Sequence, residues 1–291
     1  MNNNGFIINK EEIDRRLLLI FSDENCGDNA AFKAAGYSIL NGGKRVRPIL
    51  LLEFYRMCDG KNEEAYSFAL ALEMIHTYSL IHDDLPCMDN DDMRRGKPSC
   101  HKAYGEDMAL LAGDALLTLA FKTASTVKTI PADRAVKAIG FLAEMAGISG
   151  MIGGQVTDLK IENTAAPIEL VRDMYLKKTG ALLKAASSIG CILAGREDMV
   201  DKAGEYADNV GLAFQIIDDI LDKTADEKLF GKPIGSDDKN QKTTYVSKYG
   251  LEQSKKIAAE LTENALKILD KFDGDSSELK RITNELLDRK Y

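Results

Sequence analysis

Apolar residues recur at helical spacing along most of the chain, and this periodicity constrains the fold more than any other feature. In the stretch 63–82, for example, Phe68, Leu72 and Ile75 fall on one stripe. Ala, Leu, Met, Glu and Lys dominate, and only six prolines occur in 291 residues. Runs of β-branched residues with alternating polarity are scarce. The sequence therefore predicts an all-α protein.

Three further segments, 108–125, 168–195 and 204–222, are apolar on most faces, which is typical of helices at the centre of a bundle. Short breaks rich in Gly, Pro and polar residues separate the helical stretches, at 41–48, 94–99, 131–133, 163–167 and 229–242. None of these breaks is long enough to act as a domain linker. We expect residues 1–291 to form a single domain, a bundle of about ten or more helices.

The charge balance and the cysteines indicate which partners and which cellular compartment to expect. Lys and Arg number 38 against 46 Asp and Glu, and the net charge of -8 argues against a nucleic-acid partner. The first 16 residues are too polar for a signal peptide, and apolar runs such as 48–54 are too short to span a membrane. The five cysteines form no CxxC pair. We expect a cytoplasmic protein with reduced thiols and no stable membrane association.

The stretch SLIHDDLPCMDNDDMRRGK, residues 79–97, places several carboxylates directly after an apolar helix. Clustered carboxylates repel one another, and their desolvation is costly unless a positive charge lies between them. Pro86 interrupts the helix and allows Asp89 to turn back toward Asp83, with Asp84 beside it. A second acidic cluster, Asp218, Asp219 and Asp222, lies on an apolar helix within FQIIDDILD at 214–222.

All-carboxylate ligation at two helix ends suits Mg²⁺, which keeps several waters and bridges protein carboxylates to substrate phosphates. The alternative for one such cluster alone is a solvated helix end. A calcium-binding loop is also conceivable for the first cluster, but its ligand positions do not fit. Counted from Asp89, the fifth position is Met93, the glycine position is Arg94 and the twelfth position is Cys100.

Cations accompany these clusters. In GGKRVRP, Lys44 and Arg47 stand beside two glycines at a predicted helix start, with Arg45 pointing elsewhere. Arg94 and Arg95 follow the first cluster, and adjacent arginines point in different directions. Because guanidinium groups suit bidentate contact with phosphate oxygens, the set predicts two anionic groups, one held through metal ions and one held directly.

From about residue 36 to the C-terminus the sequence resembles the short-chain trans-isoprenyl diphosphate synthases, and most closely the bacterial farnesyl diphosphate synthases. The resemblance lies in a series of motifs in the same order: GGKRVRP, HTYSLIHDDLPCMDNDDMRRGKPSCH, AGDALL, GGQVTDL, KKTGALL, FQIIDDILD and GKPIGSD. It implies an all-α homodimer of the isoprenoid synthase type with a deep central cleft. The implied substrates are isopentenyl diphosphate and an allylic diphosphate.

The resemblance also implies roles for individual residues. Three Mg²⁺ ions would bind the allylic diphosphate through six aspartates, Asp83, Asp84, Asp89, Asp218, Asp219 and Asp222. The same diphosphate would contact three cations, Arg94, Lys178 and Lys232. The isopentenyl diphosphate would be held by Lys44, Arg47, His76 and Arg95. Thr179 and Gln215 would lie near the reacting carbons, and together with Lys178 they are the expected catalytic residues.

We therefore expect a farnesyl diphosphate synthase (geranyltranstransferase) that ionises the allylic diphosphate with the help of Mg²⁺. Tyr78, five residues before Asp83 on the same helix, is the expected floor of the product pocket, since an aromatic residue there accompanies fifteen-carbon products in the family. One alternative is a synthase with a geranylgeranyl or geranyl product. Another is a non-catalytic regulatory subunit, which should have lost some of these carboxylates or cations.

Overall fold

The computed structural model describes residues 8–22, 27–162, 164–224 and 243–287. Within them, the only strands are Met93–Arg94 (β1) and Lys97–Pro98 (β2), which form one antiparallel ribbon. The α-helices are Lys10–Ile20 (α1), Ala30–Ile39 (α3), Val46–Met57 (α4), Ala65–Asp83 (α5), Cys100–Tyr104 (α6), Glu106–Ala124 (α7), Ala132–Ala146 (α8), Met151–Ile161 (α9), Ile168–Tyr175 (α10), Ala181–Ala194 (α11), Val200–Thr224 (α12), Tyr245–Tyr249 (α15), Leu251–Leu269 (α16) and Ser277–Leu287 (α17). The predicted all-α fold is confirmed.

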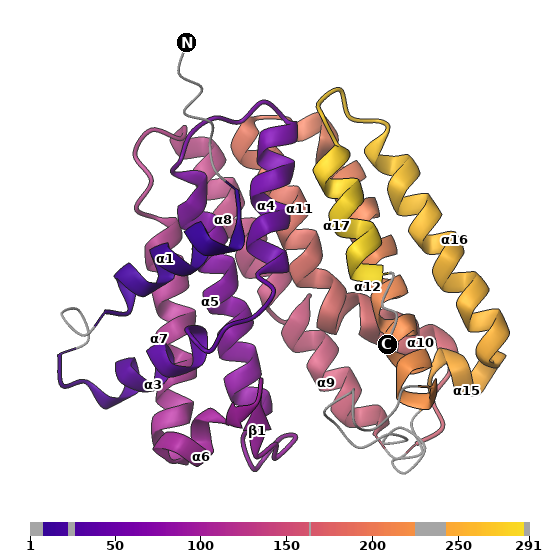
Figure 1. Cartoon of the computed structure of the whole chain (residues 1–291), viewed down its shortest axis with the longest axis horizontal. Coiled ribbons are helices and arrows are strands. Elements are labelled where there is room, and N and C mark those ends of the chain that lie inside the picture. The colour runs from indigo at the N-terminus through magenta and orange to yellow at the C-terminus, as the bar shows by residue number, and fades with distance from the viewer. Residues whose placement is uncertain (1–7, 23–26, 163, 225–242, 288–291) are drawn as a thin grey trace.

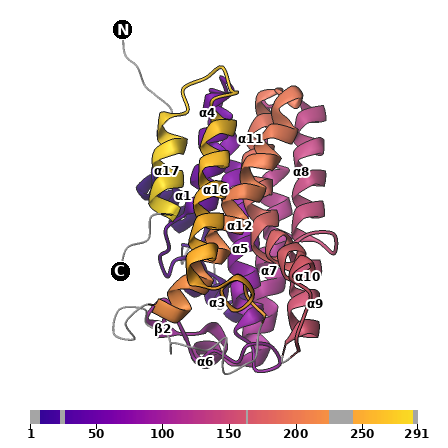
Figure 2. The same ribbon diagram turned by 90° about the vertical axis from the view of Figure 1, so that its right-hand side faces the viewer.

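The long helices stand side by side, with α5, α4 and α11 in the middle of the bundle (Figure 1). Helices α16 and α17 cover one side of the bundle, as Figure 2 shows, and α7 and α8 lie on the other. In α11, 12 of the 14 residues are buried, which explains why its sequence is apolar on nearly every face. Buried apolar side chains of helices from α1 to α17 form the main core, and a second, smaller cluster joins α10, α12, α15 and α16.

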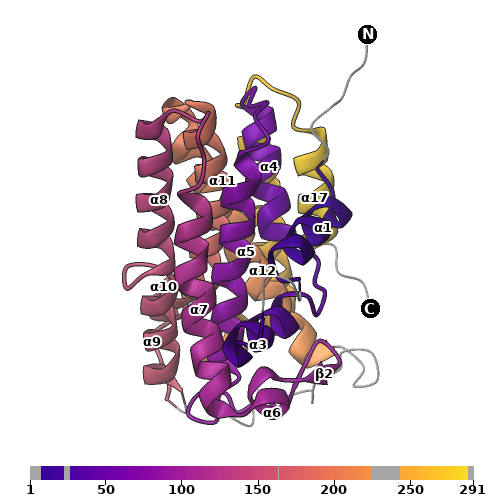
Figure 3. The same cartoon turned by 90° about the vertical axis from the view of Figure 1, so that its left-hand side faces the viewer.

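The prediction that residues 108–125 form a central helix is wrong. The corresponding helix, α7, lies near an edge of the bundle and buries only one side (Figure 3). Leu110 and Leu111 are about half exposed on its other side. An apolar sequence shows that a helix face avoids water, but it does not reveal whether the chain's own core or another molecule covers that face.

The apolar segment 168–195 is not one unbroken helix in the structure. The helix α10 is followed by one turn of π-helix, Leu176–Gly180 (η1), before α11 begins. A π-turn inserts an extra residue into the helical repeat and is frequent at functional sites. The interruption falls on Lys178 and Thr179, and no Pro or Gly before it marks the change in the sequence.

One part of the chain differs from the expectation that no apolar segment is long enough for a membrane. Among the described residues, the stretch Ala132–Ile161 meets the length and composition of a membrane span. It comprises α8 and α9, which a break at Gly147–Gly150 separates. Only about a third of its most apolar window is buried inside the protein. The sequence prediction missed this segment because small residues and isolated charges interrupt the apolar run.

Candidate active site

The first acidic cluster lies where α5 ends. As predicted from Pro86, the chain turns back at this point: the backbone N–H of Asp89 donates a hydrogen bond of 2.8 Å to the carbonyl oxygen of Asp83. Burial raises the pKa of Asp83 to about 6, Lys178 opposes this effect, and the charge of Asp89 adds to it. The carboxyl of Asp83 therefore has a strong electrostatic preference for a nearby cation.

The neighbouring Asp84 is buried and paired with Arg94. The Arg94 Nε atom lies 3.0 Å from Asp84 Oδ1, and a second guanidinium nitrogen contacts the same oxygen. Arg94 also donates to Asp91 Oδ2 at 3.2 Å. The roles expected for Asp84 toward a metal ion and for Arg94 toward a diphosphate stay predictions, because in this structure the two side chains neutralise each other.

The π-turn positions Lys178 and Thr179. The Lys178 ammonium donates a hydrogen bond of 2.6 Å to Asp158 Oδ2 on α9. Burial alone would lower the pKa of Lys178, but Asp158, with Asp83 and Asp89, raises it above its ordinary value. Lys178 therefore keeps its positive charge beside the first acidic cluster.

The second acidic cluster lies on α12, which packs tightly against the π-turn. A Cβ atom at Gly211 would lie only 2.9 Å from the Cα of Gly180. Gln215 is one helical turn beyond this contact and Asp218 almost two turns, so the helix carries the cluster away from the segment that holds Lys178. In Figure 1 the last turns of α5 and α12 lie at the same, lower end of the bundle.

Within the second cluster the aspartates differ in their surroundings. Asp219 is buried and accepts hydrogen bonds from the hydroxyl of Tyr175 (2.8 Å) and the backbone N–H of Tyr245 (3.1 Å). Asp218 is more exposed, and Gln215 Nε2 lies 3.4 Å from its Oδ2. Asp219 therefore fixes α12 against α10 and α15, whereas Asp218 is better placed to reach a ligand.

The two acidic clusters are the candidate ligands of a magnesium ion. Among the described residues, no three His, Cys, Asp or Glu side chains gather at one point in a ready-made metal site. Mg²⁺ usually takes one or two protein carboxylates and completes its shell with waters and substrate phosphates, so the oxygen-only donors of the two acidic clusters fit it. Asp83 and Asp89 at one helix end and Asp218 and Asp222 at the other supply such carboxylates.

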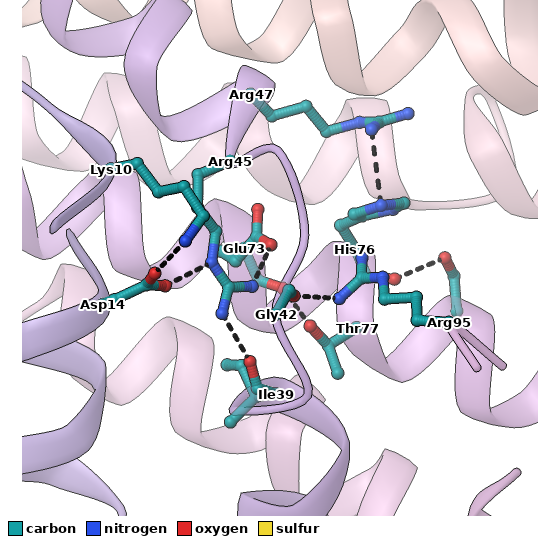
Figure 4. A network of polar contacts seen from close by, with 11 residues as sticks. Lys10, Asp14, Ile39, Gly42, Arg45, Arg47, Glu73, His76, Thr77 and Arg95 are labelled. Carbon is teal, nitrogen blue, oxygen red and sulfur yellow. Dashed lines mark hydrogen bonds and ion pairs between the residues drawn. The ribbon is translucent and has the colours of Figure 1, made fainter. Parts of the chain in front are cut away.

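The four residues expected to hold isopentenyl diphosphate, Lys44, Arg47, His76 and Arg95, line one cavity of about 160 Å³, here called the cationic cavity. Burial lowers the pKa of His76 well below its ordinary value, and the surrounding arginines lower it further, so the imidazole is neutral at pH 7. Arg47 Nη1 lies 3.4 Å from His76 Nε2 (Figure 4). Arg47 Nε is buried, and within the described part of the chain no atom accepts a hydrogen bond from it. A cavity with such a donor and several cations is suited to an anion.

Arg95 reaches this cavity across the loop that precedes α4. Its guanidinium donates to the carbonyl oxygen of Gly42 (Figure 4) and lies directly on Gly43, where a Cβ atom would be 2.9 Å from Arg95 Nη1. Gly43 has a φ of 128°, which side chains rarely adopt. The two glycines of GGKRVRP thus make room for Arg95. As expected, Arg94 and Arg95 point to different partners.

A second, larger cavity of about 660 Å³ adjoins the first. Both cavities are lined by Arg47, His76 and Thr179. Asp83 and Lys178 also line the larger one. Most of its remaining wall is apolar, with contributions from α5, the turn that follows it, α7, α9 and α11: Tyr78, Leu80, Leu85, Met88, Leu110, Leu117, Met151, Ile152, Val156, Leu159 and Leu182. An anion site and an apolar chamber with its own charged end therefore meet at three shared residues.

Several residues of this region received no role from the sequence. Gln155 lines the large cavity and Asp158 pairs with Lys178 beside it; both lie in the motif GGQVTDL, whose sequence alone indicates no role for either residue. Glu73 is a buried carboxylate in the cationic cavity. A single Glu on an apolar helix belongs to no motif, so the sequence did not point to it. Lys232, expected to bind a diphosphate, lies outside the described residues.

The chain is similar to known proteins over most of its length. The family model "Polyprenyl synthetase" matches residues 29–286. The geranylgeranyl diphosphate synthase of Cyanophora paradoxa is 48% identical over 256 residues, covering 87% of this chain and 85% of that protein. The chloroplastic geranylgeranyl pyrophosphate synthase of Capsicum annuum is 47% identical over 245 residues, covering 83% of this chain and 66% of that protein.

Solved structures of prenyl diphosphate synthases have the same fold as this chain. An FPP/GFPP synthase from Zymomonas mobilis superposes with a TM-score of 0.84 at 35% identity, covering 95% of both chains. The geranyltransferase of Helicobacter pylori, solved in complex with magnesium and isoprenyl diphosphate, gives a TM-score of 0.80 at 34% identity, covering 95% of this chain and 94% of that chain. The match runs from α3 to α17 and includes every helix that lines the two cavities. The chain belongs to the polyprenyl synthetase family, the trans-isoprenyl diphosphate synthases, and is a prenyltransferase.

Proposed function

We propose that this prenyltransferase adds isopentenyl diphosphate to allylic diphosphates and that its main product is the twenty-carbon geranylgeranyl diphosphate. The observation that carries the reaction is the meeting of the two cavities at Arg47, His76 and Thr179. Isopentenyl diphosphate would place its diphosphate in the cationic cavity, beside Arg47 and Arg95. The allylic substrate would place its diphosphate near Asp83 and its hydrocarbon tail along the apolar wall. The reacting carbons would then come together close to Thr179.

The chain's own residues account for the chemistry. When the allylic carbon–oxygen bond breaks, negative charge develops on the departing diphosphate beside the Lys178 ammonium. The hydroxyl of Thr179 and the amide of Gln215 offer oxygen dipoles to the allylic cation. The double bond of isopentenyl diphosphate attacks this cation to form a carbon–carbon bond, and the departing diphosphate takes up the proton that is lost. The apolar wall excludes water, which would otherwise trap the cation.

The residues that fit a metal ion are Asp83, Asp89, Asp218 and Asp222, with Asp84 and Asp219 beside them. Bound Mg²⁺ would stabilise the negative charge on the allylic diphosphate and make an acidic region attractive to a polyanion. A complement of three ions is part of this proposal. The support is the oxygen-only character of the two clusters and the magnesium in the related Helicobacter pylori structure.

Two observations bear on the length of the product, and they favour different candidates. The two curated relatives described above are named geranylgeranyl synthases, which supports a twenty-carbon product over the farnesyl product that the sequence alone had favoured. Tyr78 favours the second candidate, farnesyl diphosphate, because its buried ring stands in the cavity wall about 7.5 Å from Asp83 along the helix axis, at 1.5 Å per residue.

Product analysis distinguishes the candidates. The purified protein is incubated with Mg²⁺, isopentenyl diphosphate and dimethylallyl diphosphate, and the dephosphorylated products are separated by reverse-phase chromatography. We expect a twenty-carbon alcohol as the main product. A fifteen-carbon alcohol would favour the second candidate, and a lack of elongation would contradict the proposed reaction. It would also favour a non-catalytic subunit, although each expected aspartate and cation is present in the sequence.

We also propose that the protein is a homodimer. Large apolar side chains are exposed on the side of the bundle formed by α7, α8 and α9 (Figure 3), namely Leu110, Leu111, Val136, Ile148, Ile152, Val156 and Leu159. Exposed apolar residues in such number mark an interaction surface. Leu110, Ile152, Val156 and Leu159 also line the large cavity, so a second copy of the chain would shield its outer wall from water.

A further inference from the structure

Arg45, between the two proposed isopentenyl diphosphate ligands Lys44 and Arg47, does not point into solvent. Only 2% of its surface is exposed, and its guanidinium makes three directed contacts (Figure 4). Nε donates to Asp14 Oδ1 at 2.8 Å, Nη1 to Glu73 Oε1 at 2.6 Å, and Nη2 to the carbonyl oxygen of Ile39 at 2.7 Å. The side chain thus joins α1, α3 and α5 to the residue that immediately precedes α4.

The backbone of Arg45 is equally constrained. Its φ is 52°, in the left-handed region, which is costly for a residue other than glycine. Such a conformation persists only when its surroundings enforce it. Here the three guanidinium contacts do so, and they fix the turn from which Lys44 and Arg47 emerge on either side of Arg45.

Glu73, the second partner, is the critical carboxylate. It is also 2% exposed, it lines the cationic cavity, and its charge acts on both Arg47 and Arg95. A buried carboxylate without a partner is costly, so it draws the nearest guanidinium to itself. If Arg45 were absent, the nearest candidates would be Arg47 and Arg95, the two arginines that the proposed reaction assigns to the isopentenyl diphosphate.

We propose that Arg45 is a positioning residue for the isopentenyl diphosphate site, because its ion pair with Glu73 keeps Arg47 and Arg95 available for the diphosphate. This inference rests on the proposed function. It assigns to the middle arginine of GGKRVRP a role without substrate contact. Arg45 acts by pairing with the Glu73 carboxylate, and its own charge is not needed in the cavity.

The test is a pair of variants analysed by steady-state kinetics at saturating allylic substrate. Arg45→Met keeps a long unbranched side chain at the left-handed position and leaves Glu73 unpaired. We expect its KM for isopentenyl diphosphate to rise about tenfold or more, with kcat and the KM for the allylic diphosphate within about threefold of wild type. Adding Glu73→Gln to Arg45→Met removes the unpaired carboxylate and should return the KM to within about threefold of wild type.

A purely architectural role for Arg45 predicts a different result, because the double variant still lacks all three guanidinium contacts. Equal KM values in the single and double variants would therefore overturn the proposal, as would an unchanged KM in Arg45→Met. Asp14→Asn is the matched control, since it weakens a partly exposed contact of Arg45 but leaves the pair with Glu73 intact. It should keep the wild-type KM.

Should Arg45→Met fail to fold, Glu73→Gln alone decides the question. Arg45 then keeps Asp14 and Ile39, and the KM for isopentenyl diphosphate should stay the same or fall. A tenfold rise would mean that Glu73 itself is required and would overturn the proposal. Wild-type turnover is measured first: its absence would contradict the proposed function, whereas turnover with an unaffected Arg45→Met variant would overturn only the role of Arg45.

Discussion

Lys178 on the π-turn and Asp158 on α9 form a hydrogen-bonded ion pair of 2.6 Å that joins two helices at the charged end of the large cavity. Both side chains are partly buried. The pair restricts an otherwise flexible ammonium to one direction, next to Asp83 and Asp89. A cation held in place before the substrate arrives costs little reorganisation when charge develops on a leaving group.

We predict that Lys178→Met lowers kcat about a hundredfold, because it removes a fixed positive charge beside the departing diphosphate. Lys177→Met is the matched control: Lys177 adjoins Lys178 but pairs with Asp173 at 2.8 Å, so kcat should stay near the wild-type value. Steady-state kinetics with varied allylic diphosphate measures both. An equal loss in the two variants would contradict a specific role for Lys178.

The two acidic clusters should both be essential. Asp83→Asn or Asp218→Asn is expected to reduce turnover about a thousandfold while the helical circular dichroism spectrum stays unchanged, since each change removes a metal-ligating carboxylate. Asp92→Asn is the control, because Asp92 belongs to the same acidic run but pairs with Lys102 at 2.8 Å. Full activity of either cluster variant, or of the wild type in excess chelator, would rule out metal-assisted ionisation.

Tyr78→Ala should lengthen the main product by at least one five-carbon unit relative to wild type. The ring stands in the wall of the large cavity, and its removal opens space toward Met74, which lies about one turn deeper on α5. Ser79→Ala changes the adjacent lining residue by a single oxygen atom and should leave the product unchanged. Chromatography of dephosphorylated products provides the measurement. An active Tyr78→Ala enzyme with the wild-type product would show that another residue limits chain length.

Glu64 should support the fold in a pH-dependent way. Its carboxylate accepts hydrogen bonds from the backbone N–H groups of Lys128, Thr129 and Ile130, and the contact with Thr129 is the main cause that lowers its pKa to about 2. A folded-state pKa below the ordinary value of 4.5 means that the stabilisation is complete above pH 4.5 and lost as the pH falls through 2.

We therefore expect Glu64→Gln to lower Tm at neutral pH, and the difference from wild type to shrink between pH 4.5 and pH 2. Thermal unfolding followed by circular dichroism across this range measures it. Glu260→Gln, at an exposed position of α16, provides the control and should leave Tm unchanged. A Tm difference for Glu64→Gln that does not depend on pH would show that the loop hydrogen bonds do not require the charge.

The exposed apolar side formed by α7, α8 and α9 should hold two copies of the chain together. Light scattering is expected to give twice the chain mass at micromolar concentration. Ile148→Asp places a charge where 82% of the side chain is exposed and should produce a monomer. Leu19→Asp on α1, also exposed but on another helix, should remain dimeric. A monomeric wild type would contradict the assignment of this surface.

Local chemistry explains what could be predicted from the sequence. The return of Asp89 to Asp83 follows from a proline one turn after the helix, and the divergence of Arg94 and Arg95 follows from backbone geometry. Helical periodicity predicted the ends of α5 to within two residues and those of α12 to within four. These features depend on neighbours in the chain, which a sequence shows directly.

What could not be predicted depends on partners brought together by folding. Asp84 pairs with Arg94 although several cations were available, and Glu73 finds Arg45 from another helix. The exposure of one side of α7 was missed because apolar composition is the same for a core and for an interface. The π-turn at Lys178 left no pattern in the sequence, since the same residue types are favourable in a π-turn and in the α-helix around it.

The π-turn constrains how the sequence of this helix can evolve. An inserted residue shifts every following side chain by about 100° around the axis, so Lys178 and Thr179 face the cavity while α11 still buries its apolar faces. A chain that lost this single residue could form an unbroken helix with better backbone hydrogen bonds, yet it would turn the two side chains elsewhere. The sequence that gives the most stable helix here therefore differs from the sequence that gives an active site. Selection for thermal stability alone would remove the inserted residue.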